Sequence, residues 1–101
     1  FKHYQAAFAH IEGAKLIAEP DQCRSNYWLQ TIMLNADQEH QRDAILQATN
    51  QAGLMTRPVW RLLHQLMPFA NCPRMDLAMA EQLARRLINI PSSSHLLSKV
   101  E

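Results

Sequence analysis

The sequence predicts an α+β fold in which helices pack against a small β-sheet. Apolar residues recur at helical spacing in separated segments, and short runs rich in aromatic and β-branched residues lie between those segments. The two glycines each follow a helical segment, where glycine commonly ends a helix. The 101 residues, of which 48% are hydrophobic, indicate one domain. A domain of this length buries about 65% of the surface that its unfolded chain exposes.

The expected order of elements begins with a helix over residues 1–11, in which Tyr4, Phe8 and Ile11 recur on one face. Gly13 ends this helix, because a glycine readily adopts the left-handed conformation found after helix ends. Residues 14–18 follow as a short strand. A turn that contains a proline then leads into the next strand.

Residues 25–34 form the clearest predicted strand, because they combine aromatic, β-branched and other apolar residues almost without a break. Such a run indicates a strand covered on both faces, or one with one face in the core and the other in an interface. Tyr27 and Trp28 are neighbours in this strand, so their side chains should point to opposite faces. Only one of them can then face a ligand, and the other is expected in the core.

A second long helix is expected to begin at Asp37, which is suited to cap it, and to end before Gly53. Its buried face should carry Ile45, Ala48 and Ala52. Residues 54–56 then form a strand. Pro58 lacks a backbone N–H and prevents this strand from continuing in the interior of the sheet.

A short helix from Trp60 to Leu66 and a loop over residues 67–73 should precede the last helix, which Asp76 is expected to cap. The buried stripe of the last helix should consist of Leu77, Ala80, Ala84 and Leu87. Residues 88–91 form a short closing strand. The predicted order is therefore helix, strand, strand, helix, strand, helix, helix, strand.

The composition argues against several classes of function. The net charge is +1, and the only close basic pair, Arg85 and Arg86, shares a helix with Glu81, so no nucleic-acid partner is expected. No apolar run approaches the ~20 residues that span a membrane. Two cysteines without a CxxC pair and five scattered histidines predict no disulfide framework and no metal site. The cysteines fit a reduced cytoplasm, and the two chain ends look cut, which indicates a fragment of a larger protein.

Arg57 is the first candidate for a binding residue. It follows a strand end and precedes a proline, so its backbone should be held extended. A guanidinium on a rigid base is well suited to a carboxylate or a phosphate. The alternative is an ordinary surface arginine or one in an intradomain salt bridge.

Trp60 and His64 are the next candidates. They are four residues apart and would share one face of a helix beginning near Val59. An indole beside an imidazole can line a pocket for a sugar or a base. Alternatively, Trp60 lies in the core and His64 is a hydrogen-bonded surface residue. The chain has no paired carboxylates, glycine-rich phosphate loop or nucleophile elbow, so no catalytic residue is expected in it.

Several short motifs together resemble the small C-terminal domain of the DegT/DnrJ/EryC1/StrS-type sugar aminotransferases, a family that includes perosamine synthetases. These motifs are SNYW at 25–28, RD at 42–43, AG at 52–53, LMTRPVW at 54–60, CP at 72–73 and LINIPSS at 87–93. The likeness covers residues 1–94.

The resemblance implies a small, mostly antiparallel sheet covered by helices, with residues 1–101 forming the C-terminal small domain of a fold-type-I aminotransferase. It implies a cytoplasmic, homodimeric enzyme of polysaccharide biosynthesis that depends on pyridoxal phosphate. Such an enzyme transfers an amino group from an amino-acid donor, usually glutamate, to a keto nucleotide sugar. The large domain of the same chain would supply the lysine that binds the cofactor, so this fragment alone should be inactive.

Under this resemblance Arg57, Trp60 and His64 are the expected substrate contacts, with Tyr27 or Trp28 second, and no residue of the chain is expected to bind the cofactor. None of Lys2, Lys15 and Lys99 matches the motif of the cofactor lysine. The alternative from another class is a stand-alone, non-enzymatic α+β domain that binds a ligand or packs against a partner.

Overall fold

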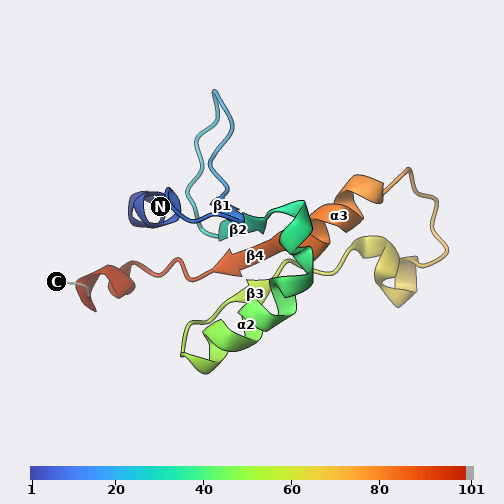
Figure 1. Cartoon of the computed structure of the whole chain (residues 1–101). Coiled ribbons are helices and arrows are strands. Elements are labelled where there is room, and N and C mark those ends of the chain that lie inside the picture. The colour runs from blue at the N-terminus through green and yellow to red at the C-terminus, as the bar shows by residue number, and fades with distance from the viewer. Residues whose placement is uncertain (100–101) are drawn as a thin grey trace.

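The computed structural model describes residues 1–99 and contains an antiparallel sheet flanked by helices (Figure 1). Within the described residues, the strands are β1 (Ala14–Leu16), β2 (Gln30–Leu34), β3 (Arg57–Pro58) and β4 (Leu87–Ile90), in the spatial order β1-β2-β4-β3. The α-helices are α1 (Lys2–Phe8), α2 (Arg42–Gln51) and α3 (Ala78–Arg86). The predicted α+β class and small antiparallel sheet are therefore confirmed, whereas Val100 and Glu101 lie outside the described residues.

The register of the sheet separates two sets of side chains. Ile32 lies opposite Ile88, so both point to the same face. This face forms the core, and partly buried side chains of α1, α2 and the neighbouring strands pack against it. The buried apolar residues of the core are Ile32, Leu34 and Ile88. The other face carries Thr31, Met33, Leu87 and Asn89, all only half-buried.

The predicted strand 25–34 begins later than expected, at Gln30. The Ser25 hydroxyl accepts a hydrogen bond from the Tyr27 amide, and the Asn26 side chain accepts one from the Trp28 amide. These local bonds compete with strand pairing, and Tyr27 has a φ of 50°, which is not extended backbone. Trp28 is 68% exposed and Tyr27 is half-buried. The prediction that one of these two residues lies in the core is therefore wrong.

The strand expected at residues 54–56 is also displaced, because β3 consists of Arg57 and Pro58. Thr56 is instead held by α2: its hydroxyl lies 2.5 Å from the Thr49 hydroxyl, and its carbonyl oxygen accepts a 3.0 Å bond from Asn50 Nδ2. The expected effect of Pro58 is confirmed, since β3 pairs only with β4 and forms an edge of the sheet.

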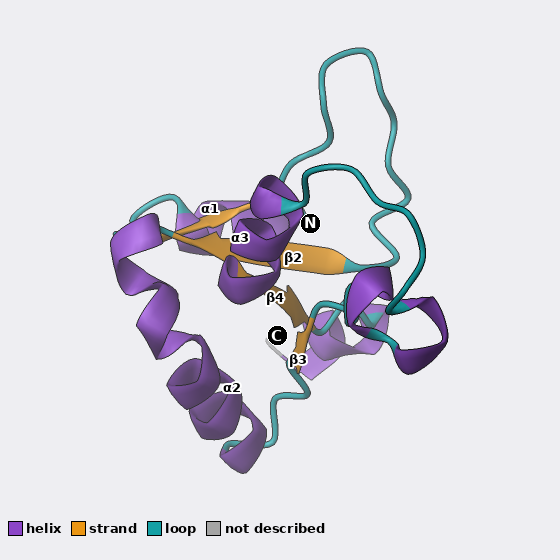
Figure 2. Cartoon of the chain, turned by 90° about the vertical axis from the view of Figure 1, so that its right-hand side faces the viewer, coloured by secondary structure: helices purple, strands orange, loops and turns teal. Residues whose placement is uncertain are grey.

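The helix α2 begins later than expected and buries a different stripe. A 3₁₀ helix (Ala36–Gln41) precedes it, and Asp37 does not cap it. Ile45 packs against the core as expected, but its companion is Leu46. The expected partners Ala48 and Ala52 are exposed, since burying a leucine removes more apolar area from water than burying an alanine. Figure 2 shows α2 extending past the sheet on the side of β3.

The helix ends agree with the sequence in part. Gly53 follows α2 with a φ of 83°, as predicted for a glycine after a helix. Gly13 has a φ of 88°, but α1 ends at Phe8, several residues before it. The N-cap of α3 is Leu77 and not Asp76 as expected, but Asp76, one residue earlier, accepts a 3.0 Å hydrogen bond from the amide of Ala78, the first residue of α3.

The expected helix from Trp60 to Leu66 is absent. Two short 3₁₀ helices, Leu63–Gln65 and Met67–Phe69, occupy this part of the chain. Together with the loop that follows they project beyond the sheet, at the end opposite the C-terminus (Figure 1). We call residues 61–75 the arm.

Tyr4 joins α1 to the segment after β4, because its hydroxyl donates a 2.7 Å hydrogen bond to the Pro91 carbonyl oxygen. Burial raises the pKa of Tyr4 above its ordinary value. The folded state thus favours the neutral phenol. Its stabilising contribution is present below pH ~10 and is lost as the pH rises through the higher pKa of the folded state.

We expect Tyr4→Phe to lower the free energy of unfolding by about 1 kcal/mol at pH 7, because it removes a part-buried hydrogen bond. Urea unfolding at pH 7 and pH 11 measures this, and the difference from the parent protein should shrink at pH 11. The control is Tyr27→Phe, since among the described contacts the Tyr27 hydroxyl accepts from the exposed Glu19 amide alone. Equal losses in the two variants at pH 7 would contradict the role of Tyr4.

Candidate functional site

A pocket of about 500 Å³ lies at the paired ends of β3 and β4. It contains two of the residues predicted to bind substrate, Arg57 and Trp60. We call it the β3–β4 pocket, and its remaining lining residues are Leu29, Met55, Pro58, Val59, Asn89, Ile90, Pro91 and Ser92. The pocket combines one cation, one large aromatic ring and a few polar groups on an apolar wall, which is the usual composition of a small-molecule site.

Arg57 is exposed and partly held by the domain itself. Its Nη1 donates 2.7 Å hydrogen bonds to Asn50 Oδ1 and to the Thr56 carbonyl oxygen. Among the described contacts, none uses Nε or Nη2 of Arg57. Arg57 is thus a surface arginine with hydrogen bonds to neutral groups, and no salt bridge among the described residues includes it. The remaining donors and the positive charge stay available at the pocket.

Trp60 is 76% exposed, so the alternative that placed it in the core is wrong. It follows the edge strand β3 directly and precedes the 3₁₀ helices of the arm. An indole with this exposure offers a flat apolar surface to a base or a sugar ring.

His64 lies apart from the β3–β4 pocket. Its Nε2 is 3.0 Å from Glu81 Oε1 on α3, which joins the arm to that helix. Its neighbours line a separate pocket that includes Phe69, Cys72 and Met75. Trp60 and His64 do not share a helix face, because residues 63–65 form a single 3₁₀ turn that begins after Trp60. The alternative of a hydrogen-bonded surface histidine is therefore confirmed in its hydrogen bond only, since the side chain is 15% exposed.

Tyr27 and Trp28 border the β3–β4 pocket without lining it. The Tyr27 ring stacks on Phe1, with 4.1 Å between ring centroids, and lines a neighbouring small pocket that shares Leu29. The Trp28 carbonyl oxygen accepts a 2.6 Å hydrogen bond from the Ser92 hydroxyl. This bond ties the loop before β2 to the segment after β4.

Asn89 and Ser92 line the β3–β4 pocket, although the sequence alone did not single them out. The sequence LINI at 87–90 does contain a signal for Asn89, because this polar residue interrupts an otherwise apolar strand. A half-buried amide at such a position needs a hydrogen-bonding partner, which in the structure is Thr31.

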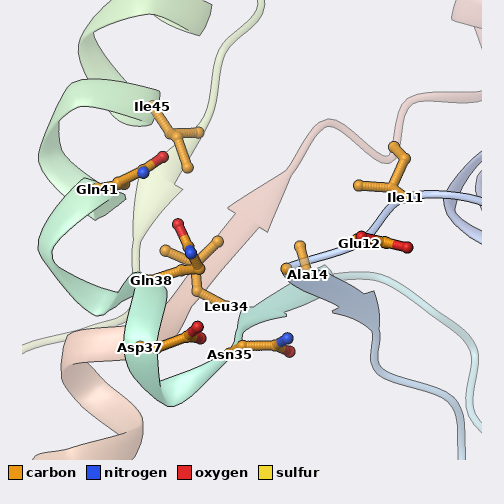
Figure 3. A pocket seen from close by; sticks show the side chains of 10 residues that line it. Ile11, Glu12, Ala14, Leu34, Asn35, Asp37, Gln38, Gln41 and Ile45 are labelled. Carbon is orange, nitrogen blue, oxygen red and sulfur yellow. The ribbon is translucent and has the colours of Figure 1, made fainter.

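A different pocket, of about 420 Å³, lies between the start of β1 and the 3₁₀ helix before α2 (Figure 3). Two carboxylates, Glu12 and Asp37, and the amides of Asn35, Gln38 and Gln41 line it. Of the described residues that form its wall, none is cationic. The β3–β4 pocket is therefore better suited to an anionic ligand.

Other kinds of site find no support in the described part of the chain. Residues 1–99 bring no three histidine, cysteine, aspartate or glutamate side chains together in a group that could hold a metal ion. Cys23 and Cys72 are exposed free thiols. None of the described helices has the length and hydropathy to cross a membrane.

Comparisons with known proteins agree with the motifs. The GDP-perosamine synthase of Caulobacter vibrioides is 27% identical over 73 residues, which is 72% of this chain and 20% of that protein. The structure resembles DesI solved with its TDP-sugar product, with a TM-score of 0.81, 20% identity, and coverage of 93% of this chain and 24% of that one. It also resembles Helicobacter pylori PseC, an aminotransferase of pseudoaminic acid biosynthesis, with a TM-score of 0.76 and 16% identity over 87% of this chain and 24% of that one.

The chain thus spans between a fifth and a quarter of the length of these relatives. The solved structures are too distant in sequence to indicate more than the fold. The sequence model of the DegT/DnrJ/EryC1/StrS aminotransferase family, in contrast, matches residues 1–100. Because this match covers nearly the whole chain, the protein belongs to the DegT/DnrJ/EryC1/StrS aminotransferase family.

Proposed function

We propose that residues 1–101 form the C-terminal small domain of a pyridoxal-phosphate-dependent aminotransferase. The enzyme transfers an amino group from glutamate to a keto nucleotide sugar, and is a cytoplasmic homodimer that serves polysaccharide biosynthesis. The observation that carries this proposal is the family match over residues 1–100. The β3–β4 pocket, with its arginine and exposed indole, is consistent with an anionic ligand that carries rings.

The domain exposes more surface than a compact protein of its size, which supports the proposal that it is part of a larger enzyme. The accessible surface is 8178 Å², whereas a compact protein of this mass exposes about 5,800 Å². The radius of gyration is 15.4 Å, against about 13 Å for a compact chain of this length. Large apolar side chains are exposed across the arm and its flanks, namely Met55, Trp60, Leu63, Met67, Met75 and Met79. Exposed apolar area of this extent favours cover by the large domain of the same protein or by the second subunit.

The described residues do not fit a site for pyridoxal phosphate. Lys2 and Lys15 are exposed, and Lys15 lies on the short strand β1. The two glycines follow helices or turns and do not open a helix that could bind a phosphate. The cofactor chemistry is therefore assigned to the large domain, and the domain described here contributes substrate contacts.

Arg57 and Trp60 are the proposed first contacts. The cation would bind an anionic group of the nucleotide sugar, and the indole would stack on a ring. Tyr27 and Trp28 are proposed as second contacts, because their loop borders the pocket through Leu29. His64 lies in a separate pocket beside Glu81, so we propose that it contacts a part of the substrate that extends beyond the β3–β4 pocket toward the arm.

The function is tested by expressing the complete protein and offering it glutamate with a panel of 4-keto nucleotide sugars. We expect stoichiometric formation of 2-oxoglutarate and an amino sugar with at least one of them. An active, cofactor-loaded preparation that aminates keto acids but no nucleotide sugar would contradict the proposed substrate class.

We expect the cofactor of the complete protein to bind a lysine outside residues 1–101. Borohydride reduction of the loaded protein, followed by peptide mapping, should give one pyridoxyl-labelled lysine in the large domain. A single specific label on Lys2, Lys15 or Lys99 would refute the division of labour proposed here. Labelling after denaturation provides the control for nonspecific reaction.

A further inference from the structure

Three polar side chains form one row across the sheet on the face opposite the core. Thr31 of β2 lies directly opposite Asn89 of β4, and Asn89 lies directly opposite Arg57 of β3. Residues that are directly opposite in neighbouring antiparallel strands point to the same face, with Cβ atoms about 5 Å apart. The sheet therefore places a hydroxyl, an amide and the base of a guanidinium side chain side by side. Asn89 and Arg57 of this row line the β3–β4 pocket.

The hydrogen bond within this row fixes which way the Asn89 amide is turned. The Thr31 hydroxyl donates to Asn89 Oδ1 at 2.9 Å. The amide oxygen is thus occupied on the Thr31 side, and no described hydrogen bond uses Nδ2. An asparagine held in this way turns the two N–H donors of Nδ2 away from Thr31.

The neighbouring segments of the pocket are also held in place by hydrogen bonds. The 2.6 Å bond from the Ser92 hydroxyl to the Trp28 carbonyl oxygen closes one side of the pocket. The 2.7 Å bond from Arg57 to Asn50 fixes the other side to α2. The donor of Asn89 therefore lies on β4, within a wall formed by β3, β4 and the segments beside them, and not on a freely moving loop.

We propose that Asn89 is a substrate-binding residue whose Nδ2 donates to an oxygen of the diphosphate of the nucleotide sugar. Thr31 is its positioning residue. The diphosphate is the favoured acceptor because Arg57 brings a positive charge to the same pocket, and a charged acceptor strengthens an N–H···O bond. This inference rests on the proposed function and adds two residues to the site.

The test uses the complete protein loaded with its cofactor. Calorimetry measures the binding of UDP, GDP and dTDP and of the matching nucleosides, and kinetics measures turnover of the nucleotide sugar that the enzyme accepts. Asn89→Asp keeps the size of the side chain but replaces the donor with a second anion. We expect it to weaken nucleoside diphosphate binding at least tenfold and to leave nucleoside binding unchanged.

Thr31→Val keeps the shape but removes the hydroxyl that holds the amide. We expect a rise of about threefold in KM with kcat retained, and recovery of the parent KM in Thr31→Ser. The control is Asn71→Asp in the arm, which introduces the same charge at an exposed residue away from the pocket and should change none of these values. Melting temperatures identify any variant that fails to fold. If Asn89→Asp does not fold, the comparison of Thr31→Val with Thr31→Ser tests the proposal.

The outcomes separate this inference from the function on which it rests. If the parent protein turns over a nucleotide sugar but Asn89→Asp and Thr31→Val bind and react as the parent does, the role of Asn89 is refuted and the function stands. If the loaded parent protein binds none of the three diphosphates and turns over no nucleotide sugar, both are refuted. Equal losses for diphosphate and nucleoside would also refute a contact to the diphosphate.

Discussion

In the complete enzyme, Arg57→Ala should lower kcat/KM for the nucleotide sugar by roughly ten- to a hundred-fold. This is the effect expected when one charge-assisted contact to a substrate anion, worth about 1.5–3 kcal/mol, is lost. The fold should survive the change, because Asn50 donates to the carbonyl and hydroxyl oxygens of Thr56 independently of the guanidinium. The melting temperature should therefore shift little, since exposed arginines usually contribute less than about 0.5 kcal/mol.

Arg61→Ala is the matched control for this prediction. Arg61 is also exposed and lies four residues further along the chain, but it does not line the β3–β4 pocket. Its removal should leave kcat/KM near that of the parent. If Arg57→Ala melts several degrees lower and retains its catalytic efficiency, Arg57 is a structural residue that fixes the end of α2, and the site lies elsewhere.

The elements of the fold that could be predicted from sequence are those with strong local signals. Gly53 ends α2, Asp76 binds the first amide of α3, and Pro58 confines β3 to an edge. The misplaced elements are those in which side chains bind the backbone nearby. Ser25 and Asn26 hold the following loop out of the sheet, and α2 holds Thr56. Such competition is invisible to a pattern of apolar residues.

The candidate site was only partly predictable for a related reason. Arg57 and Trp60 are close in sequence and share the pocket, as expected. Asn89 reaches the same pocket because β4 pairs with β3, and this pairing joins residues more than thirty positions apart. His64 was grouped with Trp60 on the assumption of an α-helix, whereas the 3₁₀ geometry and the contact to Glu81 turn it elsewhere. The inclusion of Asn89 in the pocket and the exclusion of His64 from it both depend on contacts between residues far apart in the chain, which a single sequence does not reveal.

The largest effect on stability should come from Ile88→Ala. Ile88 is 0% exposed and sits in the centre of the core, opposite Ile32 on β2 and Pro58 on β3. Replacing a buried isoleucine by alanine costs about 2–5 kcal/mol, and the cost is greatest where the surroundings cannot close the cavity. Here the neighbours are strands pinned by backbone pairing, so relaxation should be limited. Because the core contains so few buried side chains, the free energy of unfolding is small and a loss of this size should be readily measurable.

Hydrogen exchange in the complete protein measures this loss locally, and we expect the amides of β2 and β4 in Ile88→Ala to lose most of their protection. The matched control is Ile11→Ala, because Ile11 is the same residue type but is 49% exposed and lies outside the sheet. That change should cost well under half as much as Ile88→Ala.

Since Ile88 and Asn89 are adjacent on β4 and point to opposite faces, a loosened β4 should also weaken substrate binding at the β3–β4 pocket. Retained protection in β2 and β4 would mean that the helices, and not the Ile32–Ile88 pair, hold the sheet together.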